Sequence, residues 1–363
     1  MKITINQKNL LKALVTTERI VSRNPSLPIL NNILLKTENG RLKVAATNLE
    51  IGINYYIGAK IDETGEIAVP ARIFSDFIGN LGDEKITLVT KNNILSLSTN
   101  KYKTQILGLD PKDFPIIPKI KGDNFSVISA KVLKNSLNAV FDSVAVSETR
   151  PELSGVYMNF ALNYLTFTAT DSFRLTEKVS EIKHKEKNSL IIPRSTVIEL
   201  IKLASDIQED IAVKLGDNQV AFLTDNIEMV SRVIDGNYPD YRKVIPDKFI
   251  SKVLIKKNEL EKNVRLAGLF SSSTADIRLS CDEKKVSLTA KNSDKGDIQV
   301  SIDAVLKNEP FDISINHHYL LDGLKIMPTE NIVIEYTGQG SPLVLRPEQD
   351  SKDLVYLIMP LRN

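Results

Sequence analysis

The sequence predicts an α+β fold made of three tandem copies of one domain, each with two helices on one face of largely antiparallel sheets. The first observation is an apolar pattern that returns about every 120 residues along the 363-residue chain. The second is that each copy combines short strand-like runs with two runs of helical spacing. Repeats this long are whole domains, because solenoid units repeat every 20 to 50 residues or so.

Three separate anchors carry the repeat. The first is an apolar triplet, found at Ile5, Leu10 and Leu14, at Ile128, Leu133 and Leu137, and at Ile255, Leu260 and Val264. The second is the set Pro70, Pro193 and Asn316, in which both offsets are 123 residues. The third is the set Thr47, Thr170 and Lys291, with offsets of 123 and 121 residues. We therefore expect domains at residues 1–121, 122–246 and 247–363.

The first copy opens with an alternating run at residues 1–6, which predicts a strand, and continues with helical spacing over 6–21. Alternating runs then fill residues 31–57. The Asn39-Gly40 dipeptide between two of these runs is a strong signal for a two-residue hairpin turn. Short hairpin connections of this kind predict sheets that are largely antiparallel.

The second half of the first copy begins with a strand at 66–70. This strand leads through Pro70 into a helix with Phe74 on its apolar side, and a proline at a helix entrance gives up no intrahelical hydrogen bond. Further strands are predicted at 85–100 and 103–109. The predicted order is strand, helix, three strands, helix, strands, and the other two copies follow the same order.

Composition places the chain among ordinary globular proteins, with 42% hydrophobic and 25% charged residues. The single cysteine, Cys281, excludes an intramolecular disulfide and fits a reducing cytosol. We find neither a secretory signal pattern nor an apolar stretch of transmembrane length, so we expect a cytoplasmic protein without a membrane partner. The net charge of +2 argues against tight coating of DNA through many phosphate contacts.

Basic residues recur on the two predicted helices of each copy. They are Lys8, Lys12, Arg19 and Arg72 in the first copy, Lys131, Lys134 and Arg194 in the second, and Lys257, Lys262 and Arg265 in the third, where His317 and His318 open the second helix. If rotation relates the three domains, equivalent helices line one mildly basic surface. The alternative is that these residues form solvated faces, since exposed lysines are common.

The residues that could carry chemistry do not form a recognisable active site. The three histidines and the single cysteine lack metal-ligand spacing, and no phosphate-binding loop or nucleophile elbow is found in the sequence. Asp171 and Arg174 could form an acid and its partner, but a turn aspartate beside a surface arginine is the commoner arrangement. We predict a protein that is not an enzyme and uses no metal or other cofactor.

Four motifs give the chain a family resemblance. They are residues 25–35 (PSLPILNNILL), 169–176 (ATDSFRLT), 235–246 (DGNYPDYRKVIP) and 356–363 (YLIMPLRN). Together they resemble the bacterial DNA polymerase III beta subunits, the sliding clamps. The resemblance implies a head-to-tail homodimer that closes a ring around double-stranded DNA and holds it by topology. It also implies partners: the polymerase III alpha subunit, the clamp loader and other proteins with a clamp-binding motif.

The resemblance assigns three groups of residues. The expected partner-peptide pocket contains Leu153, Thr170, Ser172, Phe173, Arg174, Leu175, Pro239, Lys243, Val244, Leu357, Met359, Pro360, Leu361 and Arg362. The expected dimer interface contains Ile106, Leu107, Leu269 and Phe270. Arg23 joins the basic helix residues as an expected DNA-facing cation. Apolar side chains with a methionine suit an adaptable pocket for a short linear peptide.

The chain departs from the family pattern beside this pocket. Ser172 and Phe173 stand where the family commonly has glycine and histidine, and Lys243 stands where arginine is common. We expect the larger apolar ring of Phe173 to change the shape of the pocket and the preferred peptide. The competing hypothesis is a three-domain peptide-binding scaffold that does not encircle DNA. A hydrolase using Asp171 ranks third, because no nucleophile and base pair supports it.

Overall fold

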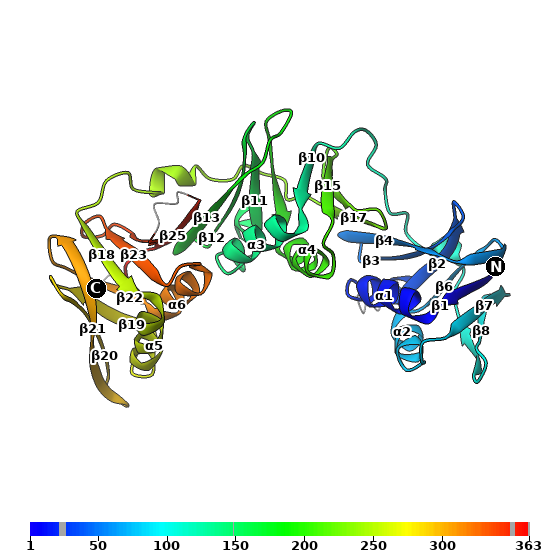
Figure 1. Cartoon of the computed structure of the whole chain (residues 1–363), viewed down its shortest axis with the longest axis horizontal. Coiled ribbons are helices and arrows are strands. Elements are labelled where there is room, and N and C mark those ends of the chain that lie inside the picture. Colours follow the sequence, from blue (N-terminus) through cyan, green and yellow to red (C-terminus); the bar gives the residue numbers. More distant parts are fainter. Residues whose placement is uncertain (22–26, 148, 349–352, 362–363) are drawn as a thin grey trace. The chain divides into compact units, whose positions relative to one another are not determined.

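A computed structural model describes residues 1–21, 27–147, 149–348 and 353–361. The chain forms two compact units, Met1–Leu133 with Ile198–Val233, and Lys134–Val197 with Ile234–Asn363. Figure 1 labels the helices and strands of both. None of the helices in these described ranges is long and apolar enough to cross a membrane.

The first copy of the repeat lies in the first unit. Its elements are β1 (Lys2–Asn6), α1 (Gln7–Glu18), η1 (Pro28–Asn31), β2 (Asn32–Glu38), β3 (Arg41–Thr47), β4 (Ile51–Gly58), β5 (Lys60–Glu63), β6 (Glu66–Pro70), α2 (Ala71–Gly79), β7 (Lys85–Lys91), β8 (Ile94–Ser98), β9 (Lys103–Leu107) and η2 (Pro111–Asp113). The two helices lie side by side, and α1 packs over β3 and β4 (Figure 1). The Asn6 side chain caps α1 by accepting the Lys8 N–H at 2.9 Å.

The second copy contributes strands to both units. Its elements are β10 (Ser126–Ser129), α3 (Ala130–Phe141), η3 (Pro151–Leu153), β11 (Gly155–Phe160), β12 (Tyr164–Thr170), β13 (Arg174–Glu181), β14 (Asn188–Pro193), α4 (Arg194–Asp206), β15 (Asp210–Leu215), β16 (Gln219–Leu223), β17 (Ile227–Arg232) and η4 (Tyr241–Val244). The Leu133 and Leu137 anchors of α3 are fully buried. The apolar spacing therefore identified the core face of this helix.

The third copy belongs to the second unit. Its elements are β18 (Ser251–Lys256), α5 (Lys257–Gly268), β19 (Asp276–Cys281), β20 (Lys285–Asn292), β21 (Gly296–Asn308), β22 (Phe311–Asn316), α6 (His317–Ile326), β23 (Asn331–Tyr336), β24 (Leu343–Pro347) and β25 (Leu354–Ile358). Helices α5 and α6 lie side by side, and α5 packs against β20 and β21 (Figure 1). Leu260 and Val264 of α5 are fully buried in the core of this copy.

The strands form three sheets. The first unit holds the orders β5-β1-β7-β8-β9 and β10-β15-β16-β17-β4-β3-β2-β6, and the second holds β14-β11-β12-β13-β25-β24-β23-β18-β21-β20-β19-β22. The pairs that continue a sheet from one copy into the next, β17 with β4 and β13 with β25, are antiparallel, as predicted for the sheets in general. Strand pairing therefore joins neighbouring copies.

Local signals in the sequence agree with the structure at the first hairpin. Asn39 and Gly40 have φ angles of 50° and 72°, which both positions of a type I′ turn require. The predicted number of strands between the two helices of each copy was wrong. The prediction was three strands, whereas the structure has five in the first copy and four in each of the other two. The strand directly before the second helix had been predicted at 66–70 but was not counted in the order, and β5 of the first copy was missed.

One backbone contact repeats in all three copies. The segment that follows the last strand of each copy donates an N–H to the strand before the second helix. The three bonds, each 2.8 Å long, are Leu109 N–H to Ala68 O, Ile234 N–H to Ile191 O, and Leu361 N–H to Ser314 O. The repeat detected in the apolar pattern thus extends to equivalent hydrogen bonds of the main chain.

Candidate functional site

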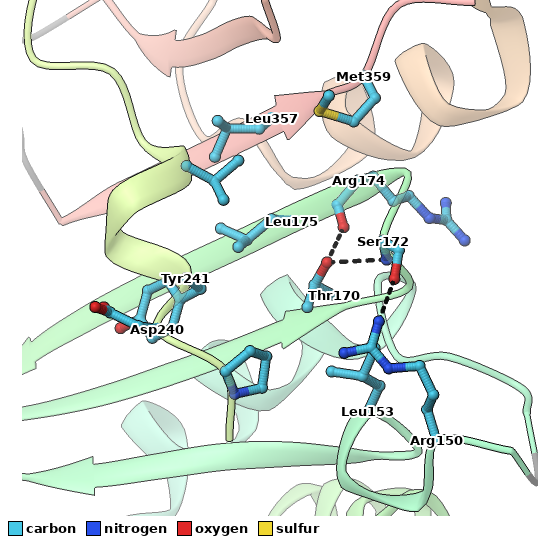
Figure 2. A pocket seen from close by; sticks show the side chains of 12 residues that line it. Arg150, Leu153, Thr170, Ser172, Arg174, Leu175, Asp240, Tyr241, Leu357 and Met359 are labelled. Atoms are coloured by element: carbon cyan, nitrogen blue, oxygen red, sulfur yellow. Dashed lines mark hydrogen bonds between the residues drawn. The ribbon is translucent and has the colours of Figure 1, made fainter. Parts of the chain in front are cut away.

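A pocket of about 250 Å³ opens in the second unit where strands from two copies meet. Figure 2 shows its lining, which comes from η3, the turn between β12 and β13, η4 and the end of β25. Nine predicted pocket residues line it: Leu153, Thr170, Ser172, Arg174, Leu175, Pro239, Val244, Leu357 and Met359. Arg150, Asp240 and Tyr241 complete the lining, and the sequence analysis had missed them.

The apolar floor is built by strand pairing across two copies. In the β13–β25 ladder, Leu175 lies opposite Leu357. Both are almost fully buried and share a small core cluster with Tyr241. The ladder extends beyond β25, because the Met359 N–H donates to the Phe173 carbonyl at 2.8 Å. Main-chain pairing therefore positions Leu357 and Met359 beside Leu175.

The turn between β12 and β13 is fixed by its own side chains. Thr170 Oγ1 donates to the Arg174 carbonyl at 2.7 Å and accepts the Ser172 N–H at 3.1 Å (Figure 2). Asp171 Oδ1 accepts the N–H groups of Phe173 and Arg174, both at 2.9 Å. Asp171 therefore builds the turn as predicted, whereas Arg174 is not the surface arginine that the commoner arrangement expected.

Arg174 is held by three groups around its guanidinium. Its Nε donates to Asp171 Oδ2 at 2.9 Å, and its Nη1 donates to Asp322 of α6. The guanidinium also lies over the Tyr319 ring, 4.6 Å from its centroid. The Arg174 side chain is only 14% exposed, and two carboxylates balance its charge. We therefore assign it to the wall of the pocket.

Tyr241 adds an aromatic surface whose hydroxyl is already engaged. The hydroxyl donates to Glu177 Oε2 at 2.5 Å. Burial, and then the charge of Glu177, raises the pKa of Tyr241 to about 12, so the phenol is neutral at physiological pH. Tyr157 and Tyr238 lie against this ring, which fixes its orientation. The tyrosine thus supplies the pocket with a rigid and uncharged wall.

Charged groups stand at the rim. Arg150 pairs with Glu152 at 3.2 Å and remains half exposed. Asp240 pairs with Lys243 at 2.8 Å, and Lys243 itself is 82% exposed and does not line the pocket. Arg150 stands one short turn before the predicted pocket residue Leu153, and this proximity was the available signal for it.

The remaining predicted pocket residues lie elsewhere. Phe173 is 58% exposed and is not part of the lining, so an effect of its ring on the preferred peptide stays a prediction. Pro360 and Leu361 are half-buried beyond the lining. Arg362 lies outside the described residues.

The predicted DNA-facing cations differ in their surroundings. Lys12, Lys131 and Lys262 are exposed, and within the described ranges no carboxylate lies within ion-pair distance of them. Six others have contacts of their own: Lys8 with Asp83, Arg19 with Asp206, Arg72 with Asp76, Arg265 with Glu261, Arg194 over the Phe141 ring, and Lys257 with the Met327 carbonyl. Lys134 is half-buried, and Arg23 lies outside the described residues. A role for these residues at DNA stays a prediction.

The predicted interface residues differ in exposure. Leu107 ends β9, an edge strand of the first unit, and is 73% exposed. Leu269 follows α5 in the second unit and is 63% exposed. Ile106 is buried inside its own domain, and Phe270 packs partly against the core of the third copy. Leu107 and Leu269 are therefore the two predicted interface residues that are mostly exposed, and their role in a dimer stays a prediction.

Comparisons with known proteins cover the whole chain. It matches the DNA polymerase III beta subunit N-terminal domain over residues 1–118, the central domain over 127–240 and the C-terminal domain over 242–362. It is 30% identical over 376 aligned positions to the beta sliding clamp of Staphylococcus aureus, with 100% of both chains covered.

Solved structures agree with these matches. The chain is similar to the DNA polymerase sliding clamp of Bacillus subtilis, with 26% identity, a TM-score of 0.95, and 100% of this chain and 99% of that chain covered. It is also similar to the DNA polymerase III subunit beta of Pseudomonas aeruginosa, with 25% identity, a TM-score of 0.95 and 100% of both chains covered. These findings confirm the predicted resemblance and the three-domain fold class.

Proposed function

The chain belongs to the bacterial DNA polymerase III beta subunit family, the sliding clamps, and on this premise we propose that it serves as a ring-shaped processivity factor for DNA replication. The observation that carries the proposal is the match of all three domains, in order and over the full length of the chain. The ring encircles duplex DNA and tethers the replicative polymerase. The protein performs no catalysis of its own and acts in the cytoplasm.

The charge distribution supports movement along DNA. The chain has 47 basic and 45 acidic residues, so its net charge is only +2. The exposed lysines Lys12, Lys131 and Lys262 stand on the first helix of each copy. A ring that holds DNA by topology needs few strong phosphate contacts, because such contacts slow sliding and make binding sensitive to salt. We propose that these lysines face the DNA.

The ring is proposed to form from two chains. The exposed leucines Leu107 and Leu269 supply an apolar contact, and β9 presents an unpaired strand edge beside the first of them. Pairing between chains would also cover that edge, which otherwise invites aggregation. A head-to-tail contact repeated twice closes a dimer.

The apolar pocket is proposed as the binding site for short linear peptides of partner proteins, among them the polymerase III alpha subunit and the clamp loader. Its buried leucines, its methionine and the fixed Tyr241 ring favour apolar anchor side chains. A few anchors of this kind supply most of the affinity of a peptide.

The decisive test uses labelled protein loaded by a bacterial clamp loader with ATP onto nicked circular DNA. We expect the protein to stay on the circle at high salt and to leave when the DNA is linearised, because salt screens phosphate contacts without opening a topological link. Equal retention on both DNAs would mean ordinary electrostatic binding. Equal loss, with a known clamp loading normally, would favour the peptide-binding scaffold that does not encircle DNA.

A further inference from the structure

The turn between β3 and β4 repeats the hydrogen bonds of the turn beside the pocket. Thr47 Oγ1 donates to the Ile51 carbonyl at 2.9 Å and accepts the Leu49 N–H at 3.0 Å. Residues 123 positions later make the same two bonds in the turn between β12 and β13. Leu49 has a φ angle of 74°, close to the 76° of Ser172. The first copy therefore carries the local frame that shapes the pocket in the second.

The strands that follow these two turns pair in the same way with a strand of the next copy. We call the pairing of β4 with β17 the first joint and the pairing of β13 with β25 the second joint. At the first joint the Arg232 N–H donates to the Glu50 carbonyl at 3.0 Å. At the second joint the Met359 N–H donates to the Phe173 carbonyl at 2.8 Å. The first joint thus has the main-chain frame of the second, where the pocket opens.

The two joints differ at one position of the frame. Leu175 lines the open pocket of the second joint (Figure 2). The first joint has Gly52 at the equivalent position, 123 residues earlier. A Cβ atom at position 52 would lie 2.7 Å from Ile117 Cγ2, whereas carbon atoms in contact lie about 3.5–4.0 Å apart. The hollow that a glycine leaves at the first joint is therefore filled by the Ile117 side chain of another segment.

The segment that carries Ile117 is held on both sides of this residue, and we call residues 114–122 the strap. Before Ile117, the Phe114 ring is buried in a small apolar cluster of the first copy. After it, Lys119 Nζ donates to Glu38 Oε1 at 3.0 Å, although Lys119 is 55% exposed. Exposed ion pairs of this kind add little stability. The second half of the strap therefore depends largely on the seat of its isoleucine.

We propose that the hollow over Gly52 is a second binding site of the chain, which takes one aliphatic side chain of an extended segment and is closed by Ile117 of the strap. The present occupant defines the chemistry of the ligand. Ile117 precedes Pro118, and a residue before proline is held in an extended conformation. A partner segment with the same isoleucine-proline pattern replaces the strap in this site. The site differs from the pocket of the second joint, so the inference does not rest on the function proposed for that pocket.

The test uses a labelled, blocked peptide with the sequence of residues 113–120, DFPIIPKI, and a matched peptide in which alanine replaces the second isoleucine. Binding to the full-length protein is measured by fluorescence anisotropy. The double variant Ile117→Ala with Lys119→Gln empties the hollow and releases the exposed ion pair. A tethered occupant competes at an effective concentration in the millimolar range, so we expect this variant to bind the peptide at least about tenfold more tightly than the unchanged protein.

Two controls locate the gain in binding. Ile116→Ala with Lys119→Gln is the matched variant, because Ile116 is the neighbouring isoleucine and is 93% exposed. We expect it to bind the peptide no more tightly than the unchanged protein does. Adding Gly52→Leu to the Ile117 variant should cancel the gain, because the new side chain fills the hollow. The peptide with alanine should show no gain with any of these proteins.

A second measurement needs no peptide and keeps the inference testable if the Ile117 variant does not fold. Gly52→Ala places a methyl group where the Ile117 side chain lies, so the strap should lift more often. Trypsin should then cleave after Lys119 at least about threefold faster, because cleavage follows the population of the opened form. Gly58→Ala is the matched control on the same strand, since a Cβ atom there would meet no described atom within 4 Å apart from its chain neighbours.

Each contrary outcome overturns the inference for a stated reason. An equal gain in the Ile116 control would mean that loosening the strap is sufficient. A gain that survives Gly52→Leu would place the peptide elsewhere on the protein. A folded Ile117 variant without any gain, or equal cleavage of the two glycine variants, would mean that the hollow is not a site that exchanges its occupant. These results leave the proposed ring and the pocket of the second joint to their own tests.

Discussion

Replacing Leu269 by alanine tests the proposed ring at a side chain that the isolated chain leaves 63% exposed. Full burial of a leucine side chain is worth about 1.5–3 kcal/mol, so covering the exposed share contributes about 1–2 kcal/mol. A closed dimer contains this contact twice. The substitution should therefore lower the free energy of dimer formation by about 2–4 kcal/mol, which raises the dissociation constant of the dimer roughly 30- to 700-fold.

Sedimentation velocity over a concentration series measures this change directly. We expect the variant to dissociate to monomers at concentrations where the unchanged protein is dimeric. Its melting temperature as a monomer should stay close to that of the unchanged monomer, because the side chain is exposed before assembly. Leu162→Ala is the matched control, since Leu162 is 49% exposed and lies in the turn between β11 and β12, far in sequence from the proposed contact.

The reasoning would be refuted by a dimer of unchanged affinity in the Leu269 variant. It would also be refuted by an equal loss in the Leu162 control, because the effect would then follow from removing any exposed leucine. Ile106→Ala provides a contrast. Ile106 is only 7% exposed, so this variant should lose about 2–5 kcal/mol of folding stability in urea titrations.

Three further predictions concern the pocket and the fold. Met359→Ala should weaken the binding of a leucine-containing peptide by about tenfold in a fluorescence anisotropy titration, because Met359 lines the pocket. Leu361→Ala should weaken this binding much less, because Leu361 lies outside the lining. Glu335→Gln should lower the free energy of unfolding by about 2–3 kcal/mol in urea, because this carboxylate is 3% exposed and pairs with two cations, which the neutral amide would leave unpaired. Burial lowers the pKa of His317 below its ordinary value of 6.5, so the unfolded chain binds a proton at a higher pH than the folded chain. The contribution of neutral His317 to folding stability is therefore fully present above about pH 6.5 and is lost as the pH drops toward the pKa of the folded state. Between about pH 7 and 5.5 the melting temperature of the His317→Gln variant should therefore fall less than that of the unchanged protein.

The local part of the fold was readable from the sequence. The apolar intervals around Leu10 and Leu260 placed the core faces of α1 and α5, because helical spacing is a property of neighbouring residues. The Asn39-Gly40 turn was equally local. The strand Glu66–Pro70 was predicted but not counted in the stated order, and β5 was not predicted at all.

The pocket was less accessible to such reasoning. It depends on the pairing of Leu175 with Leu357, which are far apart in the chain, and periodicity carries no information about that contact. The family resemblance supplied these positions. Neither the periodicity nor the family resemblance shows in which direction a side chain points. The prediction therefore included Phe173 in the pocket and omitted Arg150.

The pairings of β17 with β4 and of β13 with β25 have a consequence for how the protein holds together. The repeat in the sequence has three members, yet the compact units number two, and each takes a part of the middle copy. The repeating unit of the sequence and the compact unit of the structure are therefore out of phase. A fragment cut at residue 246 would lose the neighbour of β13, so a single repeat taken from this chain would be an incomplete body with an open strand edge.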